Sequence, residues 1–162
     1  TRKITRGVAA IHLGFQECLY LGNLDARRDW GHAADYVEGM WQILQHSKPD
    51  DFVLATGESH SVRDFVDLAF NHVDRSIDWR GVGLDTIGVD TATGRTCVRI
   101  DPRYFRPTEV HELVGDASRA KQMLGWTPKH SFPDLVDDMM KADLYTLTHS
   151  SRNEPRYSVD SV

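Results

Sequence analysis

The sequence predicts an α/β fold in which a small mixed sheet packs with several helices. Apolar residues recur at helical spacing in some segments, and short apolar runs bounded by Gly or Pro lie between those segments. The chain has 162 residues, of which 40% are hydrophobic and 27% charged, a composition typical of one globular domain. Its apolar runs are shorter than the roughly 20 residues that a membrane helix needs, so we expect no membrane span.

A helix and a strand are expected at the start of the chain. Residues 2–13 carry apolar side chains at helical spacing, and Gly14 would end that helix. Residues 18–21 are a short apolar strand, which a Gly-Asn turn and a charged loop follow. In that loop Asp29 and His32 are candidates for an acid/base pair, but we interpret both as structural residues that position the loop.

A second helix and a second strand are expected next. The helix would begin at a cap on Asp35 and end at Gln45. Residues 52–55 form an apolar run between a proline and a glycine, which favours a buried strand. The helix residues expected to face inward are Val37, Met40, Trp41 and Leu44.

A capped helix and a hairpin follow. Ser61 and Asp64 have the spacing of a capping box, which predicts a helix that continues to Val73. Residues 77–79 are expected to form an edge strand, and residues 86–99 a hairpin that turns at Thr93-Gly94. The residues expected on the inner face of the capped helix are Val62, Phe65, Val66 and Ala69.

The last part of the chain predicts two more helices. Residues 113–126 are consistent with a short strand and then a helix capped by Asp116 and ended by Gly125. Residues 132–147 predict a final amphipathic helix, and the polar residues from about 150 onward predict a flexible tail. The residues expected to face inward from the final helix are Leu135, Met139, Ala142 and Tyr145.

A segment rich in arginine and proline, residues 98–109, is the best candidate for a binding site. The two prolines stiffen the backbone, so Arg103 and Arg106 would be held on a rigid loop. A guanidinium group held in this way suits phosphate, because it is always charged and makes paired hydrogen bonds. The alternative is a surface loop with an Arg–Glu ion pair involving Glu109, and the spacing alone does not decide between them.

Charge and cysteine content narrow the class of partner. The net charge of −5 argues against nucleic acid, whose binders usually carry a basic excess. Cys18 and Cys97 are far apart in the sequence and lack metal or redox spacing, which indicates structural thiols in a reducing compartment. We therefore expect a cytoplasmic protein that binds a small anionic ligand.

Four blocks of the sequence resemble the GDP-mannose 4,6-dehydratase family, whose members are extended short-chain dehydrogenases/reductases that act on a nucleotide sugar. The resemblance covers the chain up to about Tyr145. It implies the substrate-binding portion of that fold, without the Rossmann half. The blocks are residues 1–6 (TRKITR), 20–33 (YLGNLDARRDWGHA), 55–63 (ATGESHSVR) and 101–110 (DPRYFRPTEV).

The resemblance implies a role for five residues. It places Lys3, Arg28 and Arg106 on the diphosphate of a GDP-sugar, Glu109 on the ribose and Asn23 near the base. It further implies that residues 1–149 form the GDP-sugar-binding portion. Within that portion, the segment around residues 33–56 would pack back on the Rossmann half.

The catalytic residues of such enzymes are missing from this sequence. No tyrosine is followed four residues later by lysine, and the closely spaced Gly81, Gly83 and Gly88 do not form a dinucleotide-binding fingerprint. The resemblance implies a whole enzyme that uses NADP to convert GDP-mannose to GDP-4-keto-6-deoxy-mannose as a homodimer or homotetramer. This chain alone would hold the nucleotide end and would be inactive.

Two other functions remain open at this point. The first is a related GDP-sugar reductase or a sugar-nucleotide epimerase or dehydratase, because these enzymes share the arginine and glutamate pattern. The second, of a different class, is a non-catalytic GDP-binding module. The residues upstream of Thr1 would separate the enzymes from one another, and folding and GDP binding by the chain alone would identify the module.

Overall fold

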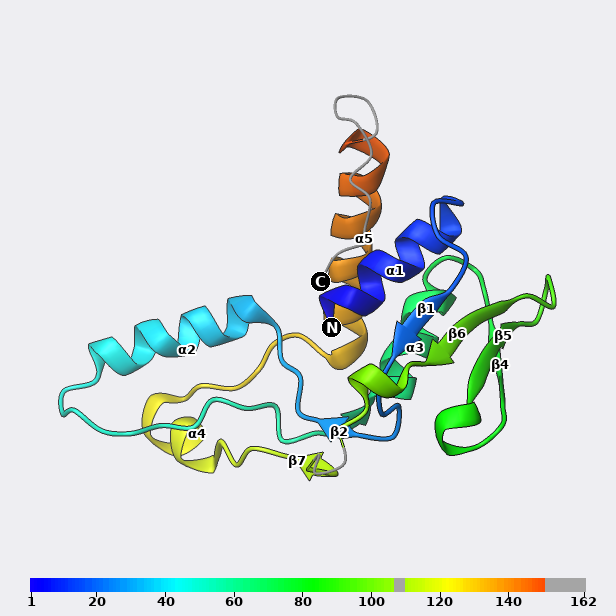
Figure 1. The fold of residues 1–162 in the computed structure, drawn as a ribbon. Helices are drawn as coiled ribbons and strands as arrows, with labels where there is room; N and C mark the ends of the chain where they lie inside the picture. The colour runs from blue at the N-terminus through cyan, green and yellow to red at the C-terminus, as the bar shows by residue number, and fades with distance from the viewer. Residues whose placement is uncertain (107–109, 151–162) are drawn as a thin grey trace.

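The computed structural model describes residues 1–106 and 110–150, so Glu109 and the expected tail lie outside the described residues. Helices and strands interleave along the chain, as predicted (Figure 1). The helices are α1 (Arg2–His12), α2 (Ala33–Gln45), α3 (Val62–Asn71), α4 (Ser118–Leu124) and α5 (Phe132–Ser150), with 3-10 turns η1 (Gly83–Asp85) and η2 (Pro102–Tyr104). The strands are β1 (Leu19–Leu21), β2 (Arg27–Arg28), β3 (His60–Ser61), β4 (Ile77–Arg80), β5 (Ile87–Asp90), β6 (Thr96–Ile100) and β7 (Glu112–Leu113).

The strands form two small mixed sheets. The larger sheet has the order β1-β6-β5-β4, in which β1 and β6 are parallel and the other pairs antiparallel. The smaller sheet has the order β3-β2-β7, with β2 parallel to β7 and antiparallel to β3. The predicted hairpin and the predicted edge strand are therefore both confirmed.

Helices α1, α3 and α5 pack with the larger sheet and form the body of the molecule (Figure 1). The expected apolar face of α1 is confirmed, because Ile4, Val8 and Ile11 are all buried. Helix α3 begins at the predicted capping box: Asp64 N donates to Ser61 Oγ (3.0 Å), and Ser61 N donates to Asp64 Oδ2 (2.8 Å). The largest fully buried apolar side chains of the body are Val8, Leu19, Phe65, Val66, Phe70, Val98, Val136 and Met140.

The inward face of α5 differs from the prediction. Tyr145 and Ala142 are exposed, Tyr145 by 66%. The buried Asp143 lies inward in their place, because Thr5 Oγ1 on α1 donates a hydrogen bond of 2.7 Å to its carboxylate. A buried carboxylate is tolerated when it has such a partner. The prediction is correct for Leu135, which is buried, and for Met139, which packs against the core, and it is wrong for the second half of the helix. The buried residues of α5 are Phe132, Leu135, Val136, Met140 and Asp143.

Helices α2 and α4, with the segments around them (residues 33–55 and 116–128), form an arm that extends away from the body (Figure 1). His32, and not the predicted Asp35, caps α2, because its Nδ1 accepts a hydrogen bond from Ala34 N (3.2 Å). The predicted cap of α4 by Asp116 is wrong, because Ala117 is the N-cap and no side chain caps the helix, although Asp116 accepts from Ser118 N (2.9 Å). The helix ends as predicted at Gly125, with φ of 70°.

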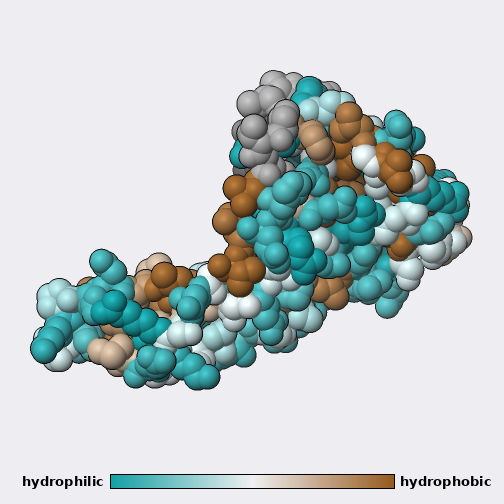
Figure 2. Space-filling view, turned by 90° about the horizontal axis from the view of Figure 1, so that it is seen from below, coloured by the Kyte–Doolittle hydropathy of each residue, from teal (hydrophilic) through white to brown (hydrophobic). Residues whose placement is uncertain are grey.

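The predicted inward face of α2 is wrong for this chain. Its four residues are exposed, and Figure 2 shows apolar surface on the arm and where the arm joins the body. The helix turns Asp35 and Gly39 inward instead, and a Cβ on Gly39 would clash with Leu54 and Trp126. The segment 52–55 is also not a strand, and neither of the described sheets includes it. The exposed fractions are 64% for Val37, 58% for Met40, 61% for Trp41 and 80% for Leu44.

Candidate functional site

The candidate site lies at the carboxyl ends of the parallel strands β1 and β6. Leu21 and Ile100 are register partners at those ends, and Asp101 N donates to Leu21 O (2.8 Å). From this point β1 leads into Gly22 and Asn23, while β6 leads into the arginine-rich segment. A Cβ on Gly22 would clash with the carbonyl of Tyr104, so only glycine permits the two segments to approach so closely.

Asp101 organises the arginine-rich segment. It caps turn η2 by accepting from Arg103 N (2.9 Å), and its Oδ2 accepts from Arg103 Nη2 (2.8 Å). These bonds from Arg103 lower the pKa of Asp101. One arginine of the segment is therefore paired with a carboxylate, although the partner is Asp101 and not a glutamate, whereas Arg106 is exposed at the end of the described segment.

Lys3 is brought to this segment from the other end of the chain. Its Nζ lies 3.3 Å from the centroid of the Tyr104 ring, a cation–π contact. The first turn of α1, where Lys3 lies, contains no acidic residue and has no side-chain cap. A helix N-terminus attracts anions because its N–H groups are unpaired and its dipole is positive there. The structure thus gathers a lysine, a helix start and the arginine-rich loop at one place.

Arg28 of β2 contacts the residue that follows the arginine-rich segment. Its Nη1 donates to Arg27 O (2.7 Å) and to Val110 O (2.8 Å). Since Val110 follows Arg106 by four residues, their Cα atoms are at most about 15 Å apart. Asn23 lies beside Gly22, and its Oδ1 accepts from Asp25 N (2.9 Å), which shapes the turn. Four of the five predicted residues therefore lie on or next to these adjoining segments, and the fifth, Glu109, lies outside the described residues.

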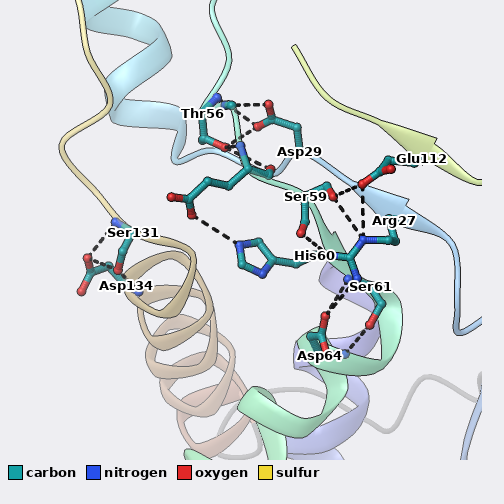
Figure 3. Close-up of polar contacts among 12 residues, drawn as sticks. Arg27, Asp29, Thr56, Ser59, His60, Ser61, Asp64, Glu112, Ser131 and Asp134 are labelled. Carbon is teal, nitrogen blue, oxygen red and sulfur yellow. Dashed lines mark hydrogen bonds and ion pairs between the residues drawn. The ribbon is translucent and has the colours of Figure 1, made fainter. Parts of the chain in front are cut away.

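Asp29 has the structural role that the sequence suggested. Its carboxylate accepts hydrogen bonds from Thr56 N (3.0 Å) and from the Thr56 hydroxyl (2.6 Å) (Figure 3). It also accepts from Gly57 N (3.0 Å) and Gly115 N (3.2 Å). Burial acts to raise the pKa of Asp29, but these hydrogen bonds outweigh it and lower the pKa. His32 is not its acid/base partner, because its Nε2 lies 3.2 Å from Asp138.

Arg27 joins the three strands of the smaller sheet. Its Nε donates to Ser59 Oγ (3.1 Å) and lies 3.5 Å from Glu112 of β7, while its Nη1 lies 3.9 Å from Asp64 of α3 (Figure 3). Arg27 and Arg28 are adjacent in the sequence but have different surroundings. Arg27 holds β2, β3 and β7 together, whereas Arg28 donates to the backbone carbonyls of Arg27 and Val110.

A hollow lies where the arm meets the body. It encloses about 270 Å³ and is lined by Trp30, Glu58, His60 and Phe132 among others. His60 stacks on Phe132 with centroids 4.0 Å apart. In the described part of the chain, no three His, Cys, Asp or Glu side chains are grouped to hold a metal.

The sequence had not indicated three features of the site: the contact of Lys3 with Tyr104, the requirement for Gly22, and the capping role of Asp101. The close approach of Gly22 to Tyr104 and the Lys3–Tyr104 contact join segments that are distant in the sequence, so no local spacing reveals them. The cap of Asp101 is local, and an aspartate directly before a proline and a turn could have indicated it. Within the described residues, no helix is both long enough and apolar enough to cross a bilayer.

Solved structures of other proteins share this fold. The chain matches a structure of RMD from Pseudomonas aeruginosa, complexed with NADPH, with a TM-score of 0.70 and 16% identity over 89% of this chain and 42% of that one. It also matches UDP-glucose 4-epimerase from Bifidobacterium longum, in complex with NAD+ and UDP, with a TM-score of 0.63 and 18% identity over 90% and 40% of the two chains. The fold is part of the extended short-chain dehydrogenase/reductase fold.

The family within that class follows from sequence. The family model described as GDP-mannose 4,6 dehydratase matches residues 1–139, and the chain belongs to that family. It is 60% identical to GDP-mannose 4,6 dehydratase of Drosophila melanogaster and 54% identical to that of Homo sapiens, over 144 residues in each case. These alignments cover 89% of this chain but only 36% and 39% of the relatives, so the chain spans little more than a third of their length.

Proposed function

We propose that this chain is the GDP-binding portion of an NADP-dependent enzyme that converts GDP-mannose to GDP-4-keto-6-deoxy-mannose. The observation that carries the proposal is the position of Lys3, whose Nζ contacts the Tyr104 ring beside the arginine-rich loop. Family membership supplies the substrate, since the relatives are named for GDP-mannose. The described residues supply cations at the end of a helix and a loop, as a diphosphate requires.

Each predicted residue has a role in this proposal. Lys3 and Arg106 contact the diphosphate from the start of α1 and from the exposed end of the arginine-rich segment. Arg28 adds its charge from β2, and Asn23 lies near the base. Glu109 accepts hydrogen bonds from the ribose. Fixing the GDP end in this way orients the hexose for reaction, which can contribute about 7–11 kcal/mol toward a barrier in favourable cases.

The three closely spaced glycines do not fit NADP. Gly81, Gly83 and Gly88 lie in and around the antiparallel pair β4 and β5, and not between a parallel strand and a helix. The cofactor and the proton-transferring residues would therefore belong to the part of the enzyme that the relatives possess beyond this chain. We propose that this other part is the Rossmann half, that the complete enzyme is cytoplasmic, and that it is a homodimer or homotetramer.

The exposed face of α2 is the proposed contact with the Rossmann half. An amphipathic helix normally buries its apolar stripe, and four large apolar residues exposed together on one helix mark an interface. The run at 52–55 lies in the same arm and includes Val53, exposed by 53%. Its backbone has no strand beside it in the described residues, so it can join a sheet of the missing half.

Binding and reconstitution test the proposal. We expect the chain, joined to the remaining part of a family member, to convert GDP-mannose, and Arg106→Ala to weaken GDP binding by about 10- to 100-fold, because it removes charge-assisted hydrogen bonds. The matched control is Arg80→Ala, an exposed arginine paired with Asp78 on β4, which should leave binding unchanged.

The outcomes separate the alternatives. A product other than the 4-keto-6-deoxy sugar would identify a related reductase or epimerase. Cooperative folding and tight GDP binding by the isolated chain, without gain on joining the other part, would identify a non-catalytic module. Equal binding by the Arg106 and Arg80 variants would contradict the proposed site itself.

A further inference from the structure

The backbone of Tyr104 is held in place at the candidate site. Tyr104 ends turn η2, and its N–H donates to Asp101 O (3.0 Å). Its carbonyl lies against Gly22, so closely that a Cβ on the glycine would clash with the carbonyl oxygen. The side chain is 45% exposed. The ring is therefore presented to solvent from a fixed point of the arginine-rich segment.

The ammonium group of Lys3 lies on a face of this ring. Its Nζ is 3.3 Å from the ring centroid, and an atom so close to the centroid must lie above the ring, because the ring's own atoms keep an in-plane neighbour farther away. The face of an aromatic ring is electron-rich and attracts a cation. The guanidinium carbon of Arg103 is more distant, at 5.8 Å from the centroid. While Lys3 occupies this face, a nucleotide base cannot stack on it.

The contact with the ring leaves the charge and the hydrogen-bond donors of Lys3 available. A lysine ammonium has three N–H donors, and a ring face engages none of them in a conventional hydrogen bond. Within the part of the chain that the structure describes, the Lys3 ammonium makes no hydrogen bond and no ion pair. A carboxylate in the place of the ring would also hold the ammonium, but it would neutralise the charge that a phosphate needs.

Arg103 keeps the neighbouring carboxylate of Asp101 from neutralising Lys3. Both Asp101 oxygens accept from Arg103 Nε, at 3.2 and 3.1 Å, and Oδ2 also accepts from Arg103 Nη2. The hydrogen bonds from Arg103 are the main cause that lowers the pKa of Asp101, and the charge of Lys3 is a smaller cause. Lys3 is thus within electrostatic reach of Asp101, but the carboxylate is engaged by Arg103 and the ammonium contacts the ring.

We propose that Tyr104 is a positioning residue, which acts on the diphosphate of the ligand through Lys3. The inference rests on the proposed function, because it requires the Lys3 ammonium to bind that diphosphate. A lysine side chain loses rotamer freedom when it binds a ligand, and this ordering opposes binding. The ring of Tyr104 orders the ammonium before the ligand arrives, so part of that cost is absent from binding. The N–H donors of Lys3 remain available to phosphate oxygens.

Titration of the full 162-residue chain with GDP tests this role. Tyr104→Leu keeps an apolar side chain but removes the aromatic face, and it should weaken GDP binding by about 3- to 10-fold, as expected when one long side chain is no longer ordered in advance. Lys3→Met should weaken binding by about 10- to 100-fold, because it removes charge-assisted hydrogen bonds. Adding Tyr104→Leu to Lys3→Met should cause no further loss, because the ring acts only through the lysine.

A conservative variant and a spectroscopic signal separate positioning from a purely structural role. Tyr104→Phe should rescue GDP binding to within about twofold of the wild type, since a phenylalanine ring also attracts a cation. In nuclear magnetic resonance spectra, the ring current should shift the ε-CH2 protons of Lys3 upfield. This shift should persist in Tyr104→Phe, vanish in Tyr104→Leu and remain when GDP is bound.

The matched control is Tyr20→Leu. Tyr20 of β1 is exposed to nearly the same degree as Tyr104 (47%), and no cation lies over its ring in the described part of the chain. The control should leave GDP binding and the signal of Lys3 unchanged. Both leucine variants should unfold at nearly the same temperature, because each removes a ring of similar exposure.

The outcomes distinguish this inference from the proposed function. If Lys3→Met and Arg106→Ala both bind GDP as tightly as the wild type, the proposed site is wrong, and the role of Tyr104 is wrong with it. If both bind more weakly but Tyr104→Leu does not, only the positioning role is wrong. The same conclusion follows if Tyr104→Leu weakens binding equally in the Lys3→Met variant, if phenylalanine does not rescue binding, or if GDP abolishes the upfield shift of Lys3.

Discussion

The body and the arm of this molecule are stabilised to different degrees by their own residues. The large buried cluster contains side chains from α1, α3, α5 and the larger sheet, and none from α2 or α4. The arm buries only a small group around Trp126, which is 2% exposed and donates through Nε1 to Asp35 O (2.9 Å). A chain that covers part of its relatives' length can thus contain a complete core beside an incomplete one.

The largest expected effect is in the body. Phe65 is fully buried and lies edge-on against Trp30 (5.3 Å between centroids) and Phe132 (5.7 Å). Phe65→Ala should lower the free energy of unfolding by about 3–5 kcal/mol, because it leaves a cavity in a packed core. Urea unfolding measures this loss. The contrast between the body and the arm would be contradicted if Trp41→Ala on the arm, where the side chain is 61% exposed, lowered the free energy of unfolding equally.

An intermediate effect is expected at the contact between α2 and the segment before α5. The Asp35 carboxylate is 2% exposed and accepts from Lys129 N (3.0 Å), His130 N (3.0 Å) and His130 Nδ1 (2.8 Å). Asp35→Asn should destabilise the arm by about 1–3 kcal/mol, because an amide replaces a charged acceptor. Hydrogen exchange of the α2 amides would report it, and Asp51→Asn, which changes an exposed carboxylate of the same arm, is the control.

The Asp35 carboxylate predicts that the stability of the arm depends on pH. Burial acts to raise the pKa of Asp35, but the hydrogen bonds from His130 and Lys129 outweigh it and lower the pKa below its ordinary value. A lowered folded pKa stabilises the fold above the unfolded value of about 3.9, and that stability is lost as the pH falls through the folded pKa. The difference between the wild type and Asp35→Asn should therefore shrink below about pH 4. A difference that is constant down to pH 2 would contradict the assignment.

The sequence predicted the body better than the arm for a physical reason. The apolar faces of α1 and α3 are buried by other parts of this chain, so local periodicity was sufficient to find them. The face of α2 and the run at 52–55 have the pattern of buried elements, but nothing in the described residues covers them. In α5 the error was different, because Asp143 is buried through its bond to Thr5, and that partner lies almost at the other end of the chain.

In the candidate site too, some features follow from local sequence and others depend on the tertiary fold. The loop stiffened by prolines and the exposed Arg106 follow from local sequence, and the resemblance to a family singled out Lys3 and Arg28. The contact between Lys3 and Tyr104 and the close approach of Gly22 to Tyr104 depend on how β1 and β6 pair. No spacing along the chain contains that information, because two segments separated by most of the domain meet only after folding.

A smaller effect is expected at the capping box of α3. Ser61→Ala removes the acceptor of the Asp64 amide and should cost about 1 kcal/mol, whereas Ser61→Gly should cost only a few tenths, because glycine is tolerated at this position. Thermal unfolding of the two variants gives the comparison. An alanine variant as stable as the wild type would show that the network around Arg27 holds the start of α3 without the serine.

The smallest effect on stability is expected on the exposed face of α2, and it separates folding from association. Trp41→Ser should change the free energy of unfolding of the isolated chain by no more than about 0.5 kcal/mol, because the side chain already faces solvent. The variant should nevertheless associate less with itself, and it should lose affinity for the remaining part of the enzyme, since a large aromatic side chain often dominates an interface. Sedimentation velocity and a binding titration measure these two effects.

The control is Leu84→Ser, which removes an apolar side chain of similar exposure (50%) from the loop between β4 and β5. If both variants reduce association equally, the face of α2 is not a specific interface, and the exposed arm is only one of several apolar surfaces.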